Sequence, residues 1–153
     1  MEKDLFRLGF IINPVAGMGG KVGLHGTDGD LYTRAITLGA VPVAHKRALV
    51  ALTALCEIRE KFVIISPPGA MGHDAIADLG FELECIPLLT NERTSAVDTA
   101  AAAEYMLRSG VQLILFSGGD GTARDIHAVI GDQIPMLGVP SGVKMRSGVF
   151  AYS

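Results

Sequence analysis

Short apolar runs alternate along the chain with stretches that repeat apolar residues at helical spacing. The runs predict buried strands at 5–12, 62–66, 81–87, 113–116 and 135–139, bounded by turn residues, and an extended piece at 41–43. Helical spacing, capping residues and terminal glycines predict helices at 30–38, 46–61, 72–79, 95–108 and 122–130. The pattern therefore predicts a single α/β domain over residues 1–153.

Strands that alternate with helices form parallel sheets through right-handed crossovers, with helices on both faces. We therefore expect a three-layer αβα sandwich with a mostly parallel sheet. The clearest helix begins at Thr94 or Ser95, and Asp98 follows Ser95 at the spacing of a capping box. Capping accounts for Ser95 and Asp98 as well as a ligand contact does, so both alternatives stay open.

Charge and composition narrow the range of partners. The formal net charge is −3, 49% of the residues are apolar, and no basic run alternates with aromatic residues. This argues against a nucleic-acid or anionic-membrane surface and favours small nucleotide ligands held locally, with a homo-oligomer left open. The apolar stretch after Met1 is too short for a secretion signal or a spanning helix, so we expect a cytoplasmic protein.

The cysteines and histidines do not indicate a metal site. Cys56 and Cys85 lie among apolar residues without a C-x-x-C motif, so we expect both to be reduced thiols in the core. The four histidines are scattered without the spacing of metal ligands, and no zinc site is expected.

Glycine clusters follow three of the predicted strands, at 13–20, 118–121 and 138–142. Ligands of open parallel sheets bind outside the carboxyl ends of the strands, so these three loops are expected to converge on one site. Two common nucleotide motifs are absent. Gly17-Met18-Gly19-Gly20-Lys21 lacks the Walker spacing, and the glycine pairs at 17–19 and 119–121 lack the third small residue of the dinucleotide fingerprint.

The segment Gly118-Gly119-Asp120-Gly121-Thr122 joins a predicted strand to a predicted helix. Glycines let phosphate oxygens approach the backbone, and the amides at a helix start supply donors and partial positive charge. The Asp120 carboxylate could accept a proton from a hydroxyl nucleophile or help to hold Mg²⁺, and its alternative role is a helix N-cap. Phosphoryl transfer needs mainly positioning and charge stabilisation, so the segment predicts a kinase.

This segment resembles the GGDGT signature shared by NAD kinases, diacylglycerol and sphingosine kinases and, in variant form, phosphofructokinases. Further motifs resemble the ATP-NAD kinase-like branch predicted to use ATP or polyphosphate. They are Asn13-Pro14-x-Ala16-Gly17-x-Gly19-Gly20, Met71-Gly72-x-Asp74-Ala75, Thr94-Ser95-Ala96-x-Asp98-Thr99 and Gly138-Val139-Pro140-Ser141-Gly142-Val143-Lys144-Met145. The resemblance covers nearly the whole chain, in order, and implies an NAD kinase/phosphofructokinase-like N-terminal domain.

The resemblance implies Asp120 as the catalytic carboxylate. The residues expected at the nucleotide are Asn13, Gly17, Gly19, Gly20, Ser95, Asp98, Gly118, Gly119, Gly121, Thr122 and Lys144. Arg146 is a further phosphate partner, although many members have histidine at its place. From the residues alone, Arg124 could reach a phosphate or pair with a carboxylate, and His73, Asp74 and Asp125 could be either site or surface residues.

The implied reaction is transfer of a phosphoryl group from ATP or polyphosphate, with Mg²⁺, to a hydroxyl of NAD. A lipid or small-alcohol kinase and a non-catalytic nucleotide-binding or regulatory module are the alternatives. Family members continue into a β-rich domain that contributes to the dinucleotide site, whereas this sequence stops at Ser153. We therefore expect that domain to be absent from the chain, which would be the N-terminal domain of a longer protein or a truncated relative.

Overall fold

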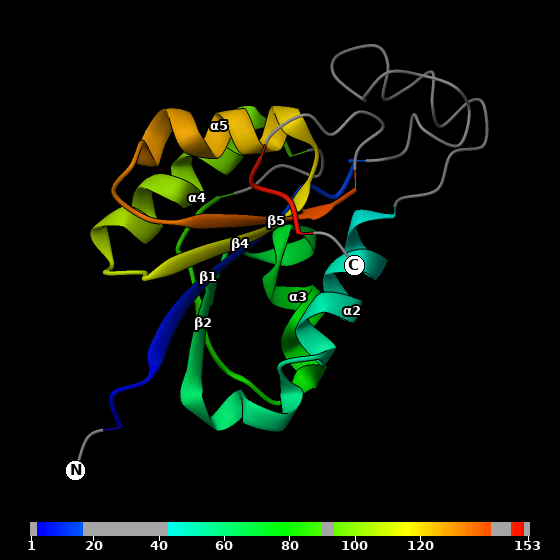
Figure 1. Ribbon diagram of the computed structural model, residues 1–153, viewed down its shortest axis with the longest axis vertical. Coiled ribbons are helices and arrows are strands. Elements are labelled where there is room, and N and C mark those ends of the chain that lie inside the picture. Colours follow the sequence, from blue (N-terminus) through cyan, green and yellow to red (C-terminus); the bar gives the residue numbers. More distant parts are fainter. Residues whose placement is uncertain (1–2, 17–42, 90–93, 142–147, 152–153) are drawn as a thin grey trace.

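The described part of the protein is built on a five-stranded parallel sheet in the order β3-β2-β1-β4-β5. Figure 1 labels β2, β1, β4 and β5. The computed structural model describes residues 3–16, 43–89, 94–141 and 148–151. The strands are β1 (Phe6–Ile12), β2 (Phe62–Ser66), β3 (Glu82–Cys85), β4 (Leu113–Gly118) and β5 (Met136–Pro140). All five strand positions agree with the apolar runs, and within the described residues every strand pair is parallel.

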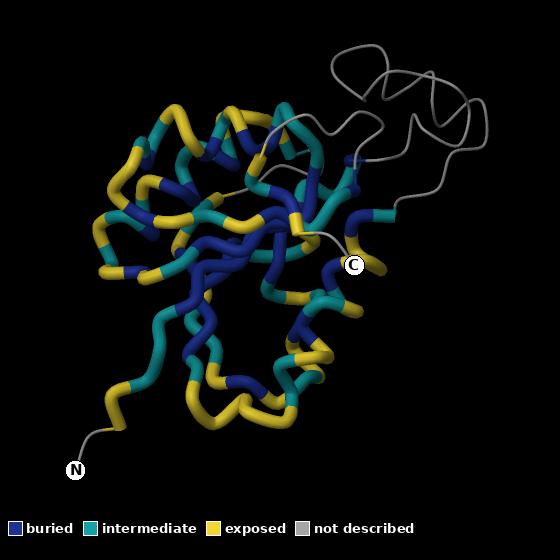
Figure 2. Tube along the Cα trace, viewed as in Figure 1, coloured by how far each residue is buried: buried dark blue, intermediate teal, exposed yellow. Residues whose placement is uncertain are grey.

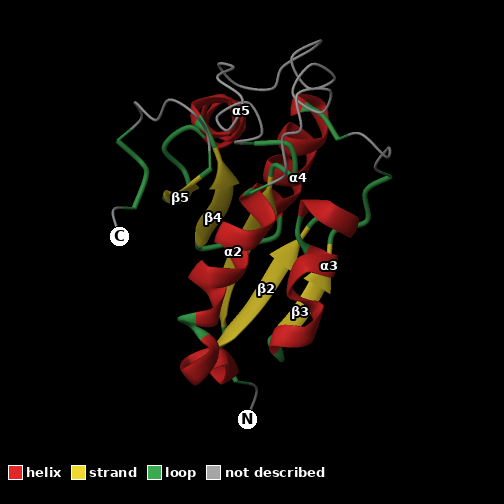
Figure 3. Cartoon of the chain, turned by 90° about the vertical axis from the view of Figure 1, so that its right-hand side faces the viewer, coloured by secondary structure: helices red, strands yellow, loops and turns green. Residues whose placement is uncertain are grey.

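Helices cover both faces of the sheet and complete the expected three layers. On one face lie α2 (Ala44–Thr53) and α3 (His73–Ile76), which face the viewer in Figure 3. The other face carries α4 (Ala96–Arg108) and α5 (Asp120–Ile130), which pack against each other. Three short 3-10 turns lie between α2 and β3 in the described chain, namely η2 (Cys56–Lys61), η3 (Gly69–Met71) and η4 (Ala77–Leu79).

Alternate residues of the central strand β1 supply the two halves of the core. Leu8, Phe10 and Ile12 belong to the cluster under α2 and α3, whereas Ile11 belongs to the cluster under α4 and α5. This alternation is the period of two that a strand imposes. Both sets are buried because the strand is covered on both faces, as the continuous dark trace of the inner strands shows (Figure 2).

Two of the predicted helices are wrong in extent. The helix expected at 46–61 ends at Thr53 and continues as the 3-10 turn η2, whose Ile58 is 39% exposed. The fully buried face of α2 stops at Leu52, and beyond it Leu55 and Cys56 are only partly buried against the same cluster. The helix expected at 72–79 is divided among Gly72, α3 and η4. The predicted helix at 30–38 lies outside the described residues, as do 41 and 42.

The expectation of two core thiols is also wrong. Both cysteines are free, but Cys56 is half-buried and Cys85 is exposed. Cys85 is the last residue of β3, an edge strand that the helices cover only in part. An apolar sequence neighbourhood therefore did not place this thiol in the core.

The segment 148–151 returns to the sheet beside β5. Phe150 forms a parallel bridge with Gly138, whose N–H donates to the Val149 carbonyl and whose carbonyl accepts from the Ala151 N–H. A Cβ on Gly138 would lie 2.5 Å from Phe150 Cδ1 and 2.7 Å from Phe116 Cζ. Glycine is therefore required at 138 for the edge-to-face contact of these two rings, whose centroids are 5.6 Å apart.

Candidate functional site

The strand order reverses between β1 and β4, which lie side by side at the centre of the sheet. From β1 the chain continues to β2 on one side, and from β4 it continues to β5 on the other. The loops that leave two such strands diverge, and this switch point is where ligands bind in open α/β sheets. Asn13 follows β1 and Gly119 follows β4, so two of the predicted site segments flank the switch point.

The predicted phosphate loop forms the end of β4 and the first turn of α5. Gly118 is the last strand residue, Gly119 is the N-cap and Asp120 is the first helical residue. The helix thus begins two residues earlier than the expected start at 122. The alternative in which Asp120 is the N-cap is wrong. Because the N-cap is glycine, it offers no side chain to the first amides of α5.

Asn13 connects the end of β1 to this first turn. Its side-chain Nδ2 donates to Thr122 Oγ1 at 3.0 Å, while its backbone N–H donates to the Ser117 carbonyl at 2.9 Å. The Asn13 Oδ1 accepts from the Val15 N–H at 3.2 Å, which fixes the orientation of the amide. The two segments are therefore joined through side chain and backbone.

Thr122 packs closely over Gly118. A Cβ on Gly118 would lie 2.5 Å from Thr122 Oγ1 and 2.7 Å from Thr122 Cβ. Only glycine fits at 118 while the threonine keeps this position, and Thr122 itself is 4% exposed. The packing of Thr122 is therefore sufficient to explain why residue 118 is glycine.

Gly121 has a different environment. Its backbone has no positive φ, and among the described residues a Cβ there would meet only Arg124 Nη2, at 3.8 Å. The fold of the described chain therefore does not require glycine at this place. The same distance shows that the guanidinium of Arg124 reaches back to the first turn of α5 and brings positive charge to the loop.

A third loop joins the other two through the residue that follows β5. The Ser141 N–H donates to the Gly118 carbonyl at 2.9 Å, and the Ser141 hydroxyl contacts that of Ser117 at 2.7 Å. The carboxyl ends of β1, β4 and β5 thus meet, as the positions of the glycine clusters predict. The sequence analysis assigned no site role to either serine, although Ser141 belongs to the motif at 138–145 and a polar residue at the end of an apolar run could have identified Ser117.

Ser95 and Asp98 make a capping box at the start of α4. Asp98 Oδ2 accepts from the Ser95 N–H at 2.7 Å and from the Ser95 hydroxyl at 3.1 Å. These contacts are those of the capping alternative, and a ligand role for the pair stays a prediction. On α3, His73 Nδ1 lies 3.7 Å from Asp74 Oδ1, and the Asp74 side chain is 75% exposed.

Several predicted residues lie outside the described residues, namely Gly17, Gly19, Gly20, Lys144 and Arg146. Within 3–16, 43–89, 94–141 and 148–151 no three histidine, cysteine or acidic side chains gather as metal ligands do. The same ranges contain no helix with the length and apolar content to cross a membrane.

Comparison with known families extends the motif matches to the chain as a whole. The model of the ATP-NAD kinase N-terminal domain matches residues 8–153. No match is found among curated proteins. The match begins within β1 and includes every later strand and helix described above.

Proposed function

Because the chain belongs to the ATP-NAD kinase N-terminal domain family, we propose that it serves the transfer of a phosphoryl group from ATP or polyphosphate to a hydroxyl of NAD. The family supports a kinase-type, nucleotide-binding domain. The particular donor and acceptor are our proposal from the family, and the loop at the switch point supports the phosphate-binding part of it.

Gly121 is the observation that carries the proposal. Glycine in a helix costs up to about 1 kcal/mol relative to alanine. No neighbour among the described residues and no positive φ calls for it at 121. A phosphate group that approaches the backbone of this turn would supply the missing reason, because a Cβ would stand between the phosphate oxygens and the amides.

The surroundings of the turn suit a phosphate. The amides at the start of α5 carry the positive end of the helix dipole, and the Arg124 guanidinium adds a full charge beside Gly121. Two flanking contacts, Asn13 to Thr122 and Ser141 to Gly118, hold the turn in place. Such pre-positioned donors stabilise transferring phosphoryl groups without reorganisation during the reaction.

Asp120 is the proposed catalytic residue. Its carboxylate would accept the proton of the acceptor hydroxyl as that oxygen attacks the terminal phosphorus, while the bond from phosphorus to the bridging oxygen breaks and the shortened donor leaves. Mg²⁺, when bound, would neutralise charge on the phosphate oxygens. The partly exposed carboxylate of Asp120 suits this ion, which proteins commonly hold through one or two carboxylates and the substrate phosphates.

The test is the substitution Asp120→Asn in the complete natural protein, with Asp132→Asn as control. Asp132 is exposed and follows the other end of α5, so the control changes net charge equally. We expect Asp120→Asn to retain ATP binding, measured by calorimetry, and to lower NAD phosphorylation at least a hundredfold. Transfer at the wild-type rate would refute the role of Asp120. Binding of ATP without transfer to NAD, NADH or simple alcohols, even by the wild type, would indicate a non-catalytic nucleotide-binding module.

A further inference from the structure

Two buried serine hydroxyls lie beneath the loops of the site. Ser117, in β4, is 0% exposed, and Ser141, which follows β5, is 3% exposed. Their Oγ atoms are 2.7 Å apart, and the Ser117 Oγ is also 2.8 Å from the carbonyl oxygen of Ala44, the first residue of α2. One pair of hydroxyls therefore connects two strand ends and the start of a helix.

The direction of these hydrogen bonds follows from the available protons. A carbonyl oxygen only accepts, so the single hydroxyl proton of Ser117 is donated to Ala44. The bond between the two serines then requires Ser141 to donate and Ser117 to accept. The Val139 carbonyl, at 3.3 Å from Ser141 Oγ, is a longer alternative acceptor. The chain of donors thus runs from Ser141 to Ser117 to Ala44.

We infer that Ser117 and Ser141 are positioning residues for the phosphate loop, a role that rests on the proposed function. The hydroxyl pair and the bond from the Ser141 N–H to the Gly118 carbonyl are two adjacent links between the same strand ends. Together they hold Ser141, which follows β5, against Ser117 and Gly118 at the end of β4. Because neither hydroxyl is exposed, the pair acts through the backbone of Gly118 and Gly119 and touches no ligand.

A third serine provides a matched control. Ser66 ends β2, is 0% exposed, and its hydroxyl has no hydrogen-bond partner among the described residues. The variants Ser66→Ala and Ser117→Ala therefore remove the same atom from a buried strand end, but only the second breaks a link. A general effect of removing a buried hydroxyl would appear in both.

Hydrogen exchange tests the link itself and needs no ligand. In the 153-residue chain, Ser141→Ala is expected to speed amide exchange at 118–122 about tenfold, although the substitution lies on another strand, and Ser66→Ala is expected to leave it unchanged. Ser117→Ala breaks two bonds, so its effect should be larger, and the double variant should exceed Ser117→Ala only slightly. Unchanged exchange at 118–122 in both Ser117→Ala and Ser141→Ala would overturn the inference.

Ligand affinity tests the positioning role. We expect the dissociation constant for MgATP to rise about tenfold in Ser117→Ala and less in Ser141→Ala, at a temperature where every variant is folded. Ser117→Cys, which keeps a weak donor, should recover part of the loss. Wild-type affinity in a variant with faster exchange would reduce the serines to a structural role and overturn the inference. A wild-type chain that binds neither ATP nor NAD would refute the proposed function, whereas the exchange result would still decide the link.

Discussion

The Asn13 side chain donates to Thr122 Oγ1 across 109 residues of sequence and so ties the end of β1 to the first turn of α5. This contact spans the point where the strand order reverses. The bond joins two segments that the sequence motifs single out separately. It makes Thr122, which is 4% exposed, a support of the loop through its side chain.

A double-mutant cycle between these two residues should reveal their coupling. We expect Asn13→Ala and Thr122→Val each to lower the free energy of unfolding, because each leaves the other side chain without its partner. The double variant should lose about 0.5–1.5 kcal/mol less than the sum of the two single losses. Urea denaturation of the four proteins measures this difference. Additive losses would show that the bond contributes nothing to stability.

How far the sequence predicts the fold depends on which contacts decide each element. Strand β2 was predicted residue for residue, because its apolar run is bounded by turn residues. The start of α4 was predicted from Ser95 and Asp98, since a capping box is local. The end of α2 was not, because the apolar spacing continues to Ile58 although the fully buried face of the helix ends at Leu52.

The candidate site likewise has parts that the local sequence predicts and parts that depend on tertiary contacts. The motif placed Asp120 between a strand and a helix, but the bond between Ser117 and Ser141 joins residues 24 positions apart. It exists because the register sets Ser117 opposite Val139 and Gly118 opposite Pro140, which brings the next residue, Ser141, over the strand end. Register between strands is a tertiary property that periodicity alone does not specify.

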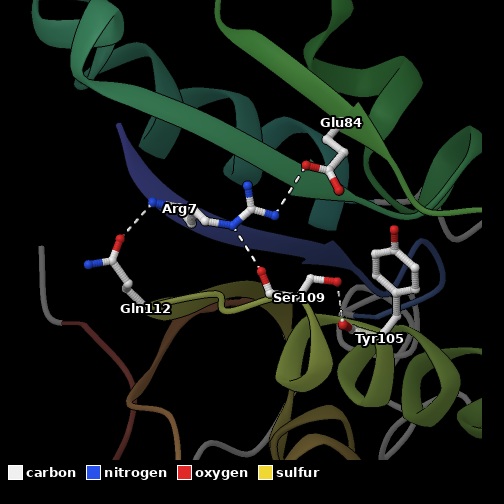
Figure 4. Close-up of polar contacts among 5 residues, drawn as sticks. All are labelled: Arg7, Glu84, Tyr105, Ser109 and Gln112. Atoms are coloured by element: carbon white, nitrogen blue, oxygen red, sulfur yellow. Dashed lines mark hydrogen bonds and ion pairs between the residues drawn. The ribbon is translucent and has the colours of Figure 1, made fainter. Parts of the chain in front are cut away.

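Arg7 joins β1 to β3 across the intervening strand β2 (Figure 4). Its Nη2 donates to Glu84 Oε2 at 3.2 Å, and its Nε donates to the Ser109 carbonyl at 3.0 Å. The two charged side chains are 32% and 38% exposed, so water weakens their attraction. We expect Glu84→Gln to cost about 0.2–1 kcal/mol of unfolding free energy and Arg7→Met about 1–2 kcal/mol, since the latter also leaves the carbonyl unpaired.

Salt separates the two parts of this contact. High salt should abolish most of the Glu84→Gln effect and little of the Arg7→Met effect, because only the ion pair is screened. Urea denaturation at low ionic strength and at roughly 1 M ionic strength measures the loss of unfolding free energy in each variant under the two conditions. Equal losses from both substitutions would contradict the importance of the bond to Ser109. Arg7 is near the start of β1, so neither variant should alter ATP affinity.

Cys85 should be a slow nucleophile near neutral pH. Partial desolvation, with a smaller effect of the Asp74 carboxylate, raises the pKa of its thiol. The raised pKa means that folding favours the neutral thiol. This contribution to stability is complete below the pKa of the unfolded chain and is lost as pH rises through the higher folded value.

Alkylation by iodoacetamide, followed at the Cys85 peptide by mass spectrometry, measures the thiolate fraction against pH. The midpoint for the folded chain should lie above that for the chain in urea, and Asp74→Asn should lower it only in part, because desolvation is the larger cause. Cys56 in the same samples controls for reagent decay. Coincident folded and unfolded profiles at Cys85 would contradict the expectation.

Gly118 and Gly121 belong to the same loop, and alanine at each should have opposite consequences. Gly118→Ala places a Cβ 2.5 Å from Thr122 Oγ1, so the threonine or the backbone must shift, at a cost of about 1–3 kcal/mol in unfolding free energy. Gly121→Ala meets nothing closer than 3.8 Å among the described residues and lies within a helix. Its stability should be equal to that of the wild type or higher by up to about 1 kcal/mol.

Affinity for MgATP should nevertheless fall in Gly121→Ala, at least tenfold by our expectation, because the methyl group would occupy the approach of the phosphate to the helix amides. Calorimetric titration and urea denaturation of the same preparation separate the two properties. A variant that is as stable as the wild type but binds MgATP poorly would show that ligand binding, rather than folding, requires glycine at position 121. Wild-type affinity would instead show that phosphate does not approach this turn. The phosphate site would then have to lie at another of the carboxyl ends of the strands.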